Sequence, residues 1–306
     1  MSSREEVGIL AALVMLSWAT PAVAEDVVDA IDLWTRTPGQ YGRGTEVTRT
    51  RVSSVRIDRM PLQEGELIDA QYGVRRRYRY VRIEELIRRY GPPSEADTAL
   101  LHFANGMAVP LPFRSVAVMQ RLRPSLAWQV QIDGAWTRVF PQISKTDAYY
   151  FDVRPTQFAG NKIVVSELWH PSLRAETEKA FSPWRHANAL TGIEFVQDRA
   201  FMAQFAAGPN VIDGARVYGD VCRFCHGARK EGAQFGWDFV EPIPISEYKK
   251  RDTSLYYHVK YRVVDATARG ILMPALPFLI ERDATDLLAW VRALAAQPLG
   301  TYAPVR

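Results

Sequence analysis

The sequence predicts a multidomain chain, in which a β-rich α+β N-terminal domain precedes an all-α C-terminal domain. Short β-branched runs separated by Asn-Gly and Asp-Gly turns fill the first half of the chain, and apolar residues recur at helical spacing in the last third. A stretch punctuated by Ser-Pro and Gly-Pro lies between them. The expected parts are a signal peptide at 1–24, an α+β domain at 25–173, a connector at 174–208, a helical domain at 209–297 and a tail at 298–306.

The composition is that of a folded, mildly basic protein. The 306 residues suffice for two hydrophobic cores, and 47% of them are hydrophobic, as in ordinary globular chains. The net charge is +4 and the sequence pI about 9.0. Such an excess predicts acidic partners or simple solubility, and it does not favour nucleic acid as a partner.

The first 24 residues have the pattern of a signal peptide. An apolar run at 8–19 precedes Ala22-Val23-Ala24, a small-x-small cleavage pattern, and the run is shorter than the roughly 20 residues that span a bilayer. Glu5 and Glu6 beside Arg4 are atypical of such a segment, and they leave open an uncleaved anchor or a misassigned start codon. No other stretch is apolar enough to cross a membrane. We therefore expect export to the periplasm and no stable membrane span after cleavage.

Local patterns predict the elements of both domains. Two β-hairpins are expected around Asn105-Gly106 and Asp133-Gly134, and a helix at 82–90 ends before Gly91-Pro92-Pro93. In the C-terminal part, a helix at 255–261 and a last helix capped by Asp283 follow from their apolar spacing.

The only cysteines of the chain lie in one motif, Cys222-Arg223-Phe224-Cys225-His226. In this C-x-x-C-H pattern two thiols on one turn can each form a thioether with a haem vinyl group, and the next residue can bind the haem iron. The motif predicts one covalent haem c, anchored by Cys222 and Cys225, with His226 as an axial iron ligand. A redox C-x-x-C would need a βαβ context, and a zinc site would need two further ligands nearby.

The second axial ligand is expected later in the chain. Met273 is the only methionine after the motif, and it precedes the last helix in a Pro-rich loop. A thioether ligand stabilises reduced iron. His258 is the main rival ligand. The sequence is also compatible with an open iron position, in which case Met273 would fill a hydrophobic core.

Residues 209–297 resemble a class I c-type cytochrome. The resemblance is carried by Gly214 and Tyr218 in the first helix, the Cys-x-x-Cys-His-Gly run at 222–227, Met273-Pro274, and Trp290 among leucines in the last helix. It implies an all-α fold around the haem, a close crossing of the first and last helices at Gly214, and electron transfer rather than catalysis.

The N-terminal part resembles the molybdopterin-binding domain of the sulfite-oxidase-like family in one feature. A helix at 81–87 is followed by a strand at 99–106 that ends in a polar Gly loop. That family binds molybdenum through a cysteine thiolate near this loop, and no cysteine lies outside the haem motif here. Molybdopterin is therefore not expected, and the domain is interpreted as a docking or assembly module.

Arginines concentrate in the N-terminal part, most densely at Arg75-Arg76-Arg77 with Arg79 and Arg82. They could dock an acidic partner or form a solvated strand face with ion pairs. His102, His170 and His186 are scattered and are expected to be structural.

Together these features predict a periplasmic mono-haem c-type cytochrome. It would exchange single electrons with a redox partner protein such as a periplasmic dehydrogenase, or serve as the haem subunit of an oxidoreductase complex. Two different functions stay open. One is a redox enzyme with its own substrate site, in the N-terminal domain or at an open haem, and the other is a haem-based redox-sensing binding protein.

Overall fold

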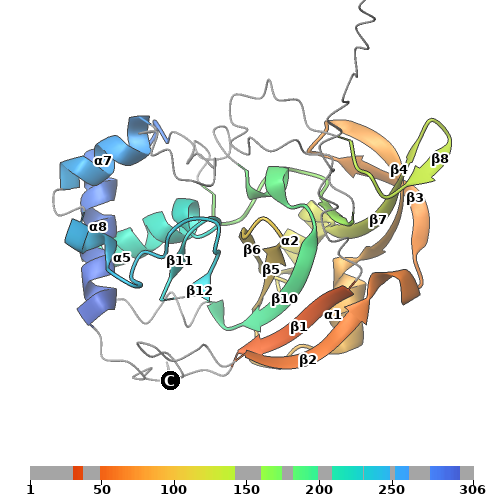
Figure 1. The fold of residues 1–306 in the computed structure, drawn as a ribbon, viewed down its shortest axis with the longest axis horizontal. Coiled ribbons are helices and arrows are strands. Elements are labelled where there is room, and N and C mark those ends of the chain that lie inside the picture. Colours follow the sequence, from red (N-terminus) through yellow and green to blue (C-terminus); the bar gives the residue numbers. More distant parts are fainter. Residues whose placement is uncertain are drawn as a thin grey trace, which may run out of the picture.

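Two five-stranded sheets, a two-stranded pair and a group of helices make up the described part of the computed structural model of the chain (Figure 1). It describes residues 30–36, 49–141, 160–173, 182–198, 209–229, 231–248, 252–261 and 276–296. Figure 1 shows α5, α7 and α8 side by side at one end, with the larger sheets at the other. The signal segment at 1–24 and Met273 lie outside the described residues. Among the described helices, none has the length and apolar character needed to cross a membrane.

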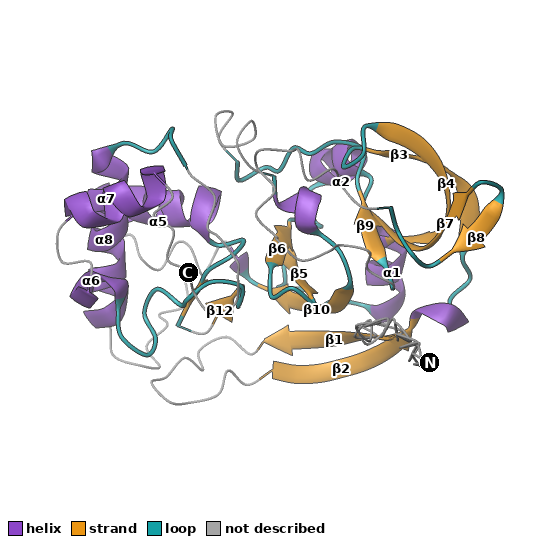
Figure 2. Cartoon of the chain, turned by 45° about the horizontal axis from the view of Figure 1, so that its top comes forward, coloured by secondary structure: helices purple, strands orange, loops and turns teal. Residues whose placement is uncertain are grey.

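The first sheet lies next to the helical group, and its strand order is β2-β1-β10-β5-β6 (Figure 2). β1 and β10 are parallel, and the other neighbours are antiparallel. The strands are β1 (Ala30–Arg36), β2 (Arg49–Arg56), β5 (Thr98–Phe103), β6 (Ala108–Leu111) and β10 (Leu190–Val196). The β5–β6 turn contains Gly106 at φ +86°, a left-handed conformation that glycine adopts without strain.

The second sheet is antiparallel, in the order β3-β4-β7-β8, with β9 also paired to β7. Its strands are β3 (Gln63–Asp69), β4 (Val74–Arg82), β7 (Ser125–Ile132), β8 (Ala135–Thr137) and β9 (Lys162–Val164). Asp133 and Gly134 both have positive φ between β7 and β8, which is the turn that a two-residue hairpin favours.

The helices bury apolar faces, and the Ser115 side chain caps α2 by accepting a hydrogen bond from the Val118 N–H. They are α1 (Ile83–Tyr90), α2 (Val116–Leu122), α5 (Pro209–Val217), α6 (Ile245–Tyr248), α7 (Asp252–Tyr261) and α8 (Glu281–Ala296). Single turns form at Ile57–Arg59 and Pro183–His186, and a π-helical turn at Tyr218–Cys222 continues α5. Gly91 ends α1 in the left-handed region, where its N–H donates to the Ile87 carbonyl.

The main hydrophobic core contains side chains from both large sheets and from α1 and α2. Leu33 of β1, Leu101 of β5 and Leu126 of β7 are fully buried in it. Phe224, from the C-x-x-C-H motif, belongs to this same core and is also fully buried. A second core lies among α5 to α8.

The prediction of an all-α C-terminal domain with the class I cytochrome c fold is wrong. The chain is an α+β protein, and residues 209–296 contribute a further antiparallel pair, β11 (Gly227–Ala228) with β12 (Glu231–Gly232), directly after the motif. The motif also packs into the core of the sheets through Phe224. Helical spacing predicted the helices but carried no information on a buried aromatic residue between two cysteines.

The range expected as a connector contributes a central strand of the first sheet. β10 pairs in parallel with β1, which precedes it by more than 150 residues, and antiparallel with β5. Its residues Leu190, Ile193 and Phe195 are buried in the main core. Local composition did not reveal this strand because its pairing partners are distant in sequence.

The expected close crossing at Gly214 is present. A Cβ at Gly214 of α5 would lie 2.0 Å from the backbone oxygen of Asp286 and 2.7 Å from the Cβ of Trp290, both on α8. Tyr218 stacks on Trp290 one turn further along, with ring centroids 4.6 Å apart. The two helices therefore touch backbone to backbone at this glycine.

We expect Gly214→Ala to lower the free energy of unfolding by about 1–3 kcal/mol, because the added methyl group forces α5 and α8 apart. This loss outweighs the roughly 1 kcal/mol that alanine gains over glycine in a helix. Urea unfolding measures it. Ile212→Ala, at an exposed position of α5, is the control, and an effect of Gly214→Ala no larger than that of the control would contradict the packing described here.

Candidate functional site

The C-x-x-C-H motif forms a tight turn at the end of α5. The π-helical turn ends at Cys222, whose carbonyl accepts hydrogen bonds from the N–H groups of Cys225 (3.1 Å) and His226 (2.9 Å). The Tyr218 hydroxyl donates to the His226 carbonyl at 3.1 Å. Both cysteines and the histidine therefore lie on one turn of the backbone.

Neither cysteine of the motif is part of a disulfide. Cys222 is buried, and Cys225 is partly exposed and packs against the main core. Burial raises the pKa of the Cys225 thiol to about 12, so that the sulfur stays protonated at neutral pH.

The His226 ring is fixed in orientation by its backbone surroundings. Its Nδ1 lies 2.8 Å from the Trp237 carbonyl oxygen, which can only accept, so Nδ1 carries the hydrogen and donates. Gly236 makes room for the ring, because a Cβ there would lie 2.4 Å from Cε1 and 2.5 Å from Nδ1. Nε2 thereby keeps its lone pair, as a metal-binding imidazole requires.

Burial lowers the pKa of His226, and the positive charge of His258 on α7 lowers it further, against the opposing effects of the Trp237 hydrogen bond and of Asp238. A lowered pKa keeps the imidazole neutral at physiological pH.

A loop after the motif holds the carbonyl that fixes His226. The Asp238 carboxylate accepts from the N–H groups of Arg229 (3.0 Å), Val240 (2.7 Å) and Glu241 (2.9 Å). The Gly236 N–H donates to the Cys225 carbonyl at 2.7 Å. Phe239 packs near the imidazole, with ring centroids 4.9 Å apart.

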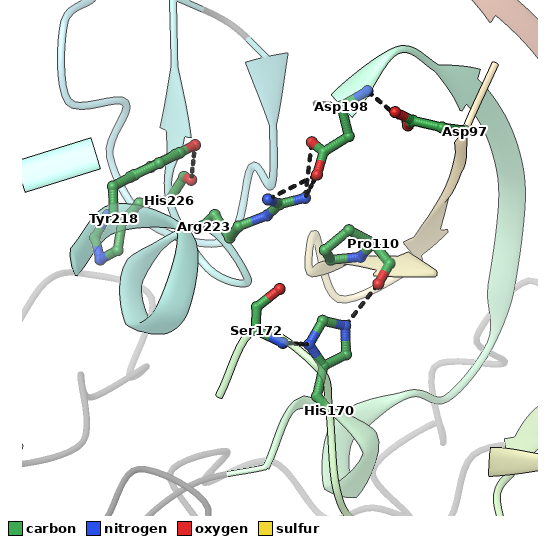
Figure 3. A network of polar contacts seen from close by, with 8 residues as sticks. All are labelled: Asp97, Pro110, His170, Ser172, Asp198, Tyr218, Arg223 and His226. Carbon is green, nitrogen blue, oxygen red and sulfur yellow. Dashed lines mark hydrogen bonds and ion pairs between the residues drawn. The ribbon is translucent and has the colours of Figure 1, made fainter. Parts of the chain in front are cut away.

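The two residues between the cysteines contact the first sheet and the segments next to it. Arg223 is nearly buried and makes a two-pronged ion pair with Asp198, at 3.0–3.1 Å, just beyond the end of β10. The Phe224 ring meets the edge of His170 at a centroid distance of 5.0 Å, and its carbonyl accepts from the Ala108 N–H of β6. Figure 3 places Arg223 between His226 on one side and Asp198 on the other.

The structure thus brings together three of the four predicted site residues, Cys222, Cys225 and His226. Met273 falls outside the described residues, and its role stays a prediction. In the described part of the chain, no cluster of three or more His, Cys, Asp or Glu side chains suits a bare metal ion.

The arginine-rich strand β4 is a separate surface, on which two of the arginines pair with one carboxylate. Glu64 of β3 contacts both Arg77 (2.6 Å) and Arg79 (3.4 Å) of β4. Arg82 donates to the Ser125 hydroxyl at 2.8 Å. Part of the strand face is thus ion-paired, and the two interpretations of the arginines both remain predictions.

The sequence did not point to Asp198, His170 or Gly236 as parts of the site. Asp198 and His170 are distant in sequence from the motif and belong to no pattern that marks them. Gly236 lies ten residues after His226, and only its position in space shows that a side chain there would displace the imidazole.

No protein-family model matches the chain, and a comparison with curated proteins finds no similar sequence.

Proposed function

We propose that this chain is an exported c-type cytochrome that carries one covalent haem at Cys222 and Cys225 and transfers single electrons. The proposal rests on the motif and the geometry of its turn, and it does not require the class I fold. The observation that carries it is the His226 imidazole, whose Nδ1 donates to the Trp237 carbonyl at 2.8 Å, next to two cysteines on the same turn that form no disulfide.

The thiols suit thioether formation. Each must be reduced to add its sulfur and hydrogen across one vinyl double bond of haem, and neither Cys222 nor Cys225 is in a disulfide. The sequence contains only these two cysteines, so a disulfide to a third cysteine of the chain cannot compete for either thiol.

The His226 ring suits an axial iron ligand. Metal-ligating histidines donate their second ring N–H to a carbonyl or carboxylate, which fixes the tautomer and raises the basicity of the ligating nitrogen. The Trp237 carbonyl has this role here, and Gly236 provides the space. Met273 is proposed as the second axial ligand, with His258 as the alternative.

Haem c, when bound, supplies an iron centre that alternates between the ferric and ferrous states and so holds one electron. Two protein ligands would leave no iron position for a substrate, which favours transfer over catalysis. The pattern at 1–24 supports a periplasmic location, and a redox partner such as a dehydrogenase is the proposed donor or acceptor.

A redox titration tests the proposal. The full chain, produced in a host that matures c-type cytochromes, is expected to show one reversible one-electron transition in its visible spectrum. The double variant Cys222→Ala/Cys225→Ala should lose the chromophore after denaturing gel electrophoresis. The oxidised parent protein is expected to show the weak red-region sulfur-to-iron band. Met273→Ala should abolish this band, and His258→Ala should retain it. Absence of the one-electron transition in the parent chain would contradict the proposal.

A further inference from the structure

We infer that the α+β part of the chain acts as a clamp that sets the axial histidine and its hydrogen bond, with Arg223 and Phe224 as positioning residues. The inference rests on the proposed function and deepens it, because it assigns a role to the N-terminal part. Neither residue would touch the iron, and each acts through the backbone of the motif.

The clamp has two halves, and the first consists of the contacts of Arg223 and Phe224, which hold the motif itself. Arg223 is nearly buried, with 9% of its side chain exposed, and its guanidinium makes two-pronged contact with Asp198. Such fork-shaped pairs fix both distance and orientation. Asp198 is itself held, because its N–H donates to the Asp97 carboxylate at 2.9 Å.

Phe224 adds an apolar anchor to the same half. Its ring is fully buried in the main core and lies against His170. His170 is fixed in turn, because its Nε2 lies 2.6 Å from the Pro110 carbonyl and its Nδ1 accepts from the Ser172 N–H. The two residues that separate the cysteines of the motif are thus tied to different elements.

The second half holds the loop that carries the Trp237 carbonyl. The Gln234 N–H donates to the Gly106 carbonyl of the β5–β6 turn at 2.7 Å. A Cβ at Gly106 would lie 3.0 Å from the Phe235 nitrogen, so this turn fits closely against the loop. One β-hairpin therefore contacts both chain segments that make the His226–Trp237 hydrogen bond, since Ala108 of the same hairpin bonds to Phe224.

A fixed His226–Trp237 bond has an electronic consequence. Donation from Nδ1 to a carbonyl makes the imidazole a stronger electron donor, which favours ferric iron. Loosening the clamp should weaken this bond and favour ferrous iron. The α+β part would thereby hold the reduction potential below the value that an isolated motif would give.

The test compares Asp198→Asn and Phe224→Leu with the parent chain. Both variants are expected to keep the covalent haem and to raise the midpoint potential, which means a several-fold higher ferrous-to-ferric ratio at a fixed solution potential. Asp198→Glu, which restores the carboxylate, should bring the potential back toward the parent value. Glu167→Gln is the matched control, because it removes one carboxylate charge from an exposed ion pair with Arg121 that has no contact with Arg223 or Asp198.

Hydrogen exchange gives a readout that does not depend on the haem. The amides of Ala108, Gln234 and Gly236 should exchange faster in Asp198→Asn and Phe224→Leu than in Glu167→Gln. Unchanged exchange in both variants, or an unchanged potential with haem attached, would overturn the clamp. A parent chain without haem would instead count against the proposed function, and the exchange measurement would still decide on the clamp.

Discussion

Asp69→Ala is expected to lower the free energy of unfolding by about 3–5 kcal/mol, because it leaves a buried ammonium group without its counter-charge. Asp69 and Lys162 are both fully buried, and their side chains meet at 2.6 Å. The same carboxylate accepts from the Tyr78 hydroxyl and the Gln71 N–H. A typical domain is stable by only about 5–15 kcal/mol, so the expected loss is a large part of the whole.

Replacing Lys162 is expected to cost less stability than replacing Asp69, because the remaining charged group differs in its hydrogen bonds. Lys162→Met leaves Asp69 with its two other donors, so we expect a smaller loss than for Asp69→Ala. The exposed pair Arg121–Glu167 gives the control, since Glu167→Gln is expected to cost about 0–1 kcal/mol. Urea unfolding of the three variants measures these differences, and a cost of Asp69→Ala equal to that of Glu167→Gln would contradict the buried pair.

Below pH 6.5, His170 is expected to make the protein progressively less stable. Burial lowers the pKa of His170 to about 3, and the nearby Arg223 adds to this effect against the opposing hydrogen bond to Pro110. The neutral ring is required, because its Nδ1 accepts a hydrogen bond from Ser172. The unfolded chain binds the proton with a pKa near 6.5.

The sign follows from the number of bound protons. Between pH 6.5 and about 3 the unfolded state holds a proton on His170 that the folded state does not, so this contribution to stability is fully present above pH 6.5 and falls as the pH is lowered. The limiting slope is about 1.4 kcal/mol per pH unit. The free energy of unfolding of the parent and of His170→Gln, measured between pH 4 and 7, isolates the contribution of His170, because the variant lacks the titrating ring. If the free energies of unfolding of the two proteins changed with pH in the same way, the lowered pKa of His170 would be refuted.

Local signals predicted the elements of the fold better than their assembly. The Asn105-Gly106 and Asp133-Gly134 turns lie between paired strands, because glycine at positive φ is a local requirement. The parallel pairing of β1 with β10 joins segments far apart in the chain, and no local pattern encodes it. The same limit explains the wrong all-α domain. Helices near α5, α7 and α8 were expected, but α6, the β11–β12 pair and the contacts of Phe224 with the main core were not.

In the candidate site too, local patterns predicted the adjacent residues but not the contacts between distant ones. The spacing of Cys222, Cys225 and His226 identified the turn, because the chemistry of two thioethers and one imidazole demands adjacent residues. The Trp237 carbonyl and Gly236 could not be assigned from spacing, since a backbone oxygen has no sequence signature and a glycine has many roles. Asp198 is 25 residues from Arg223, and only the fold brings its carboxylate to the motif.

The central claim is that Cys222 and Cys225 hold haem by thioether bonds. Mass spectrometry of the peptide containing both residues, from chain produced in a host able to mature c-type cytochromes, tests it most directly. We expect this peptide to carry the added mass of one haem after denaturation and removal of unbound haem. A peptide at its plain sequence mass, or lighter by the two hydrogens of a disulfide, would contradict the account.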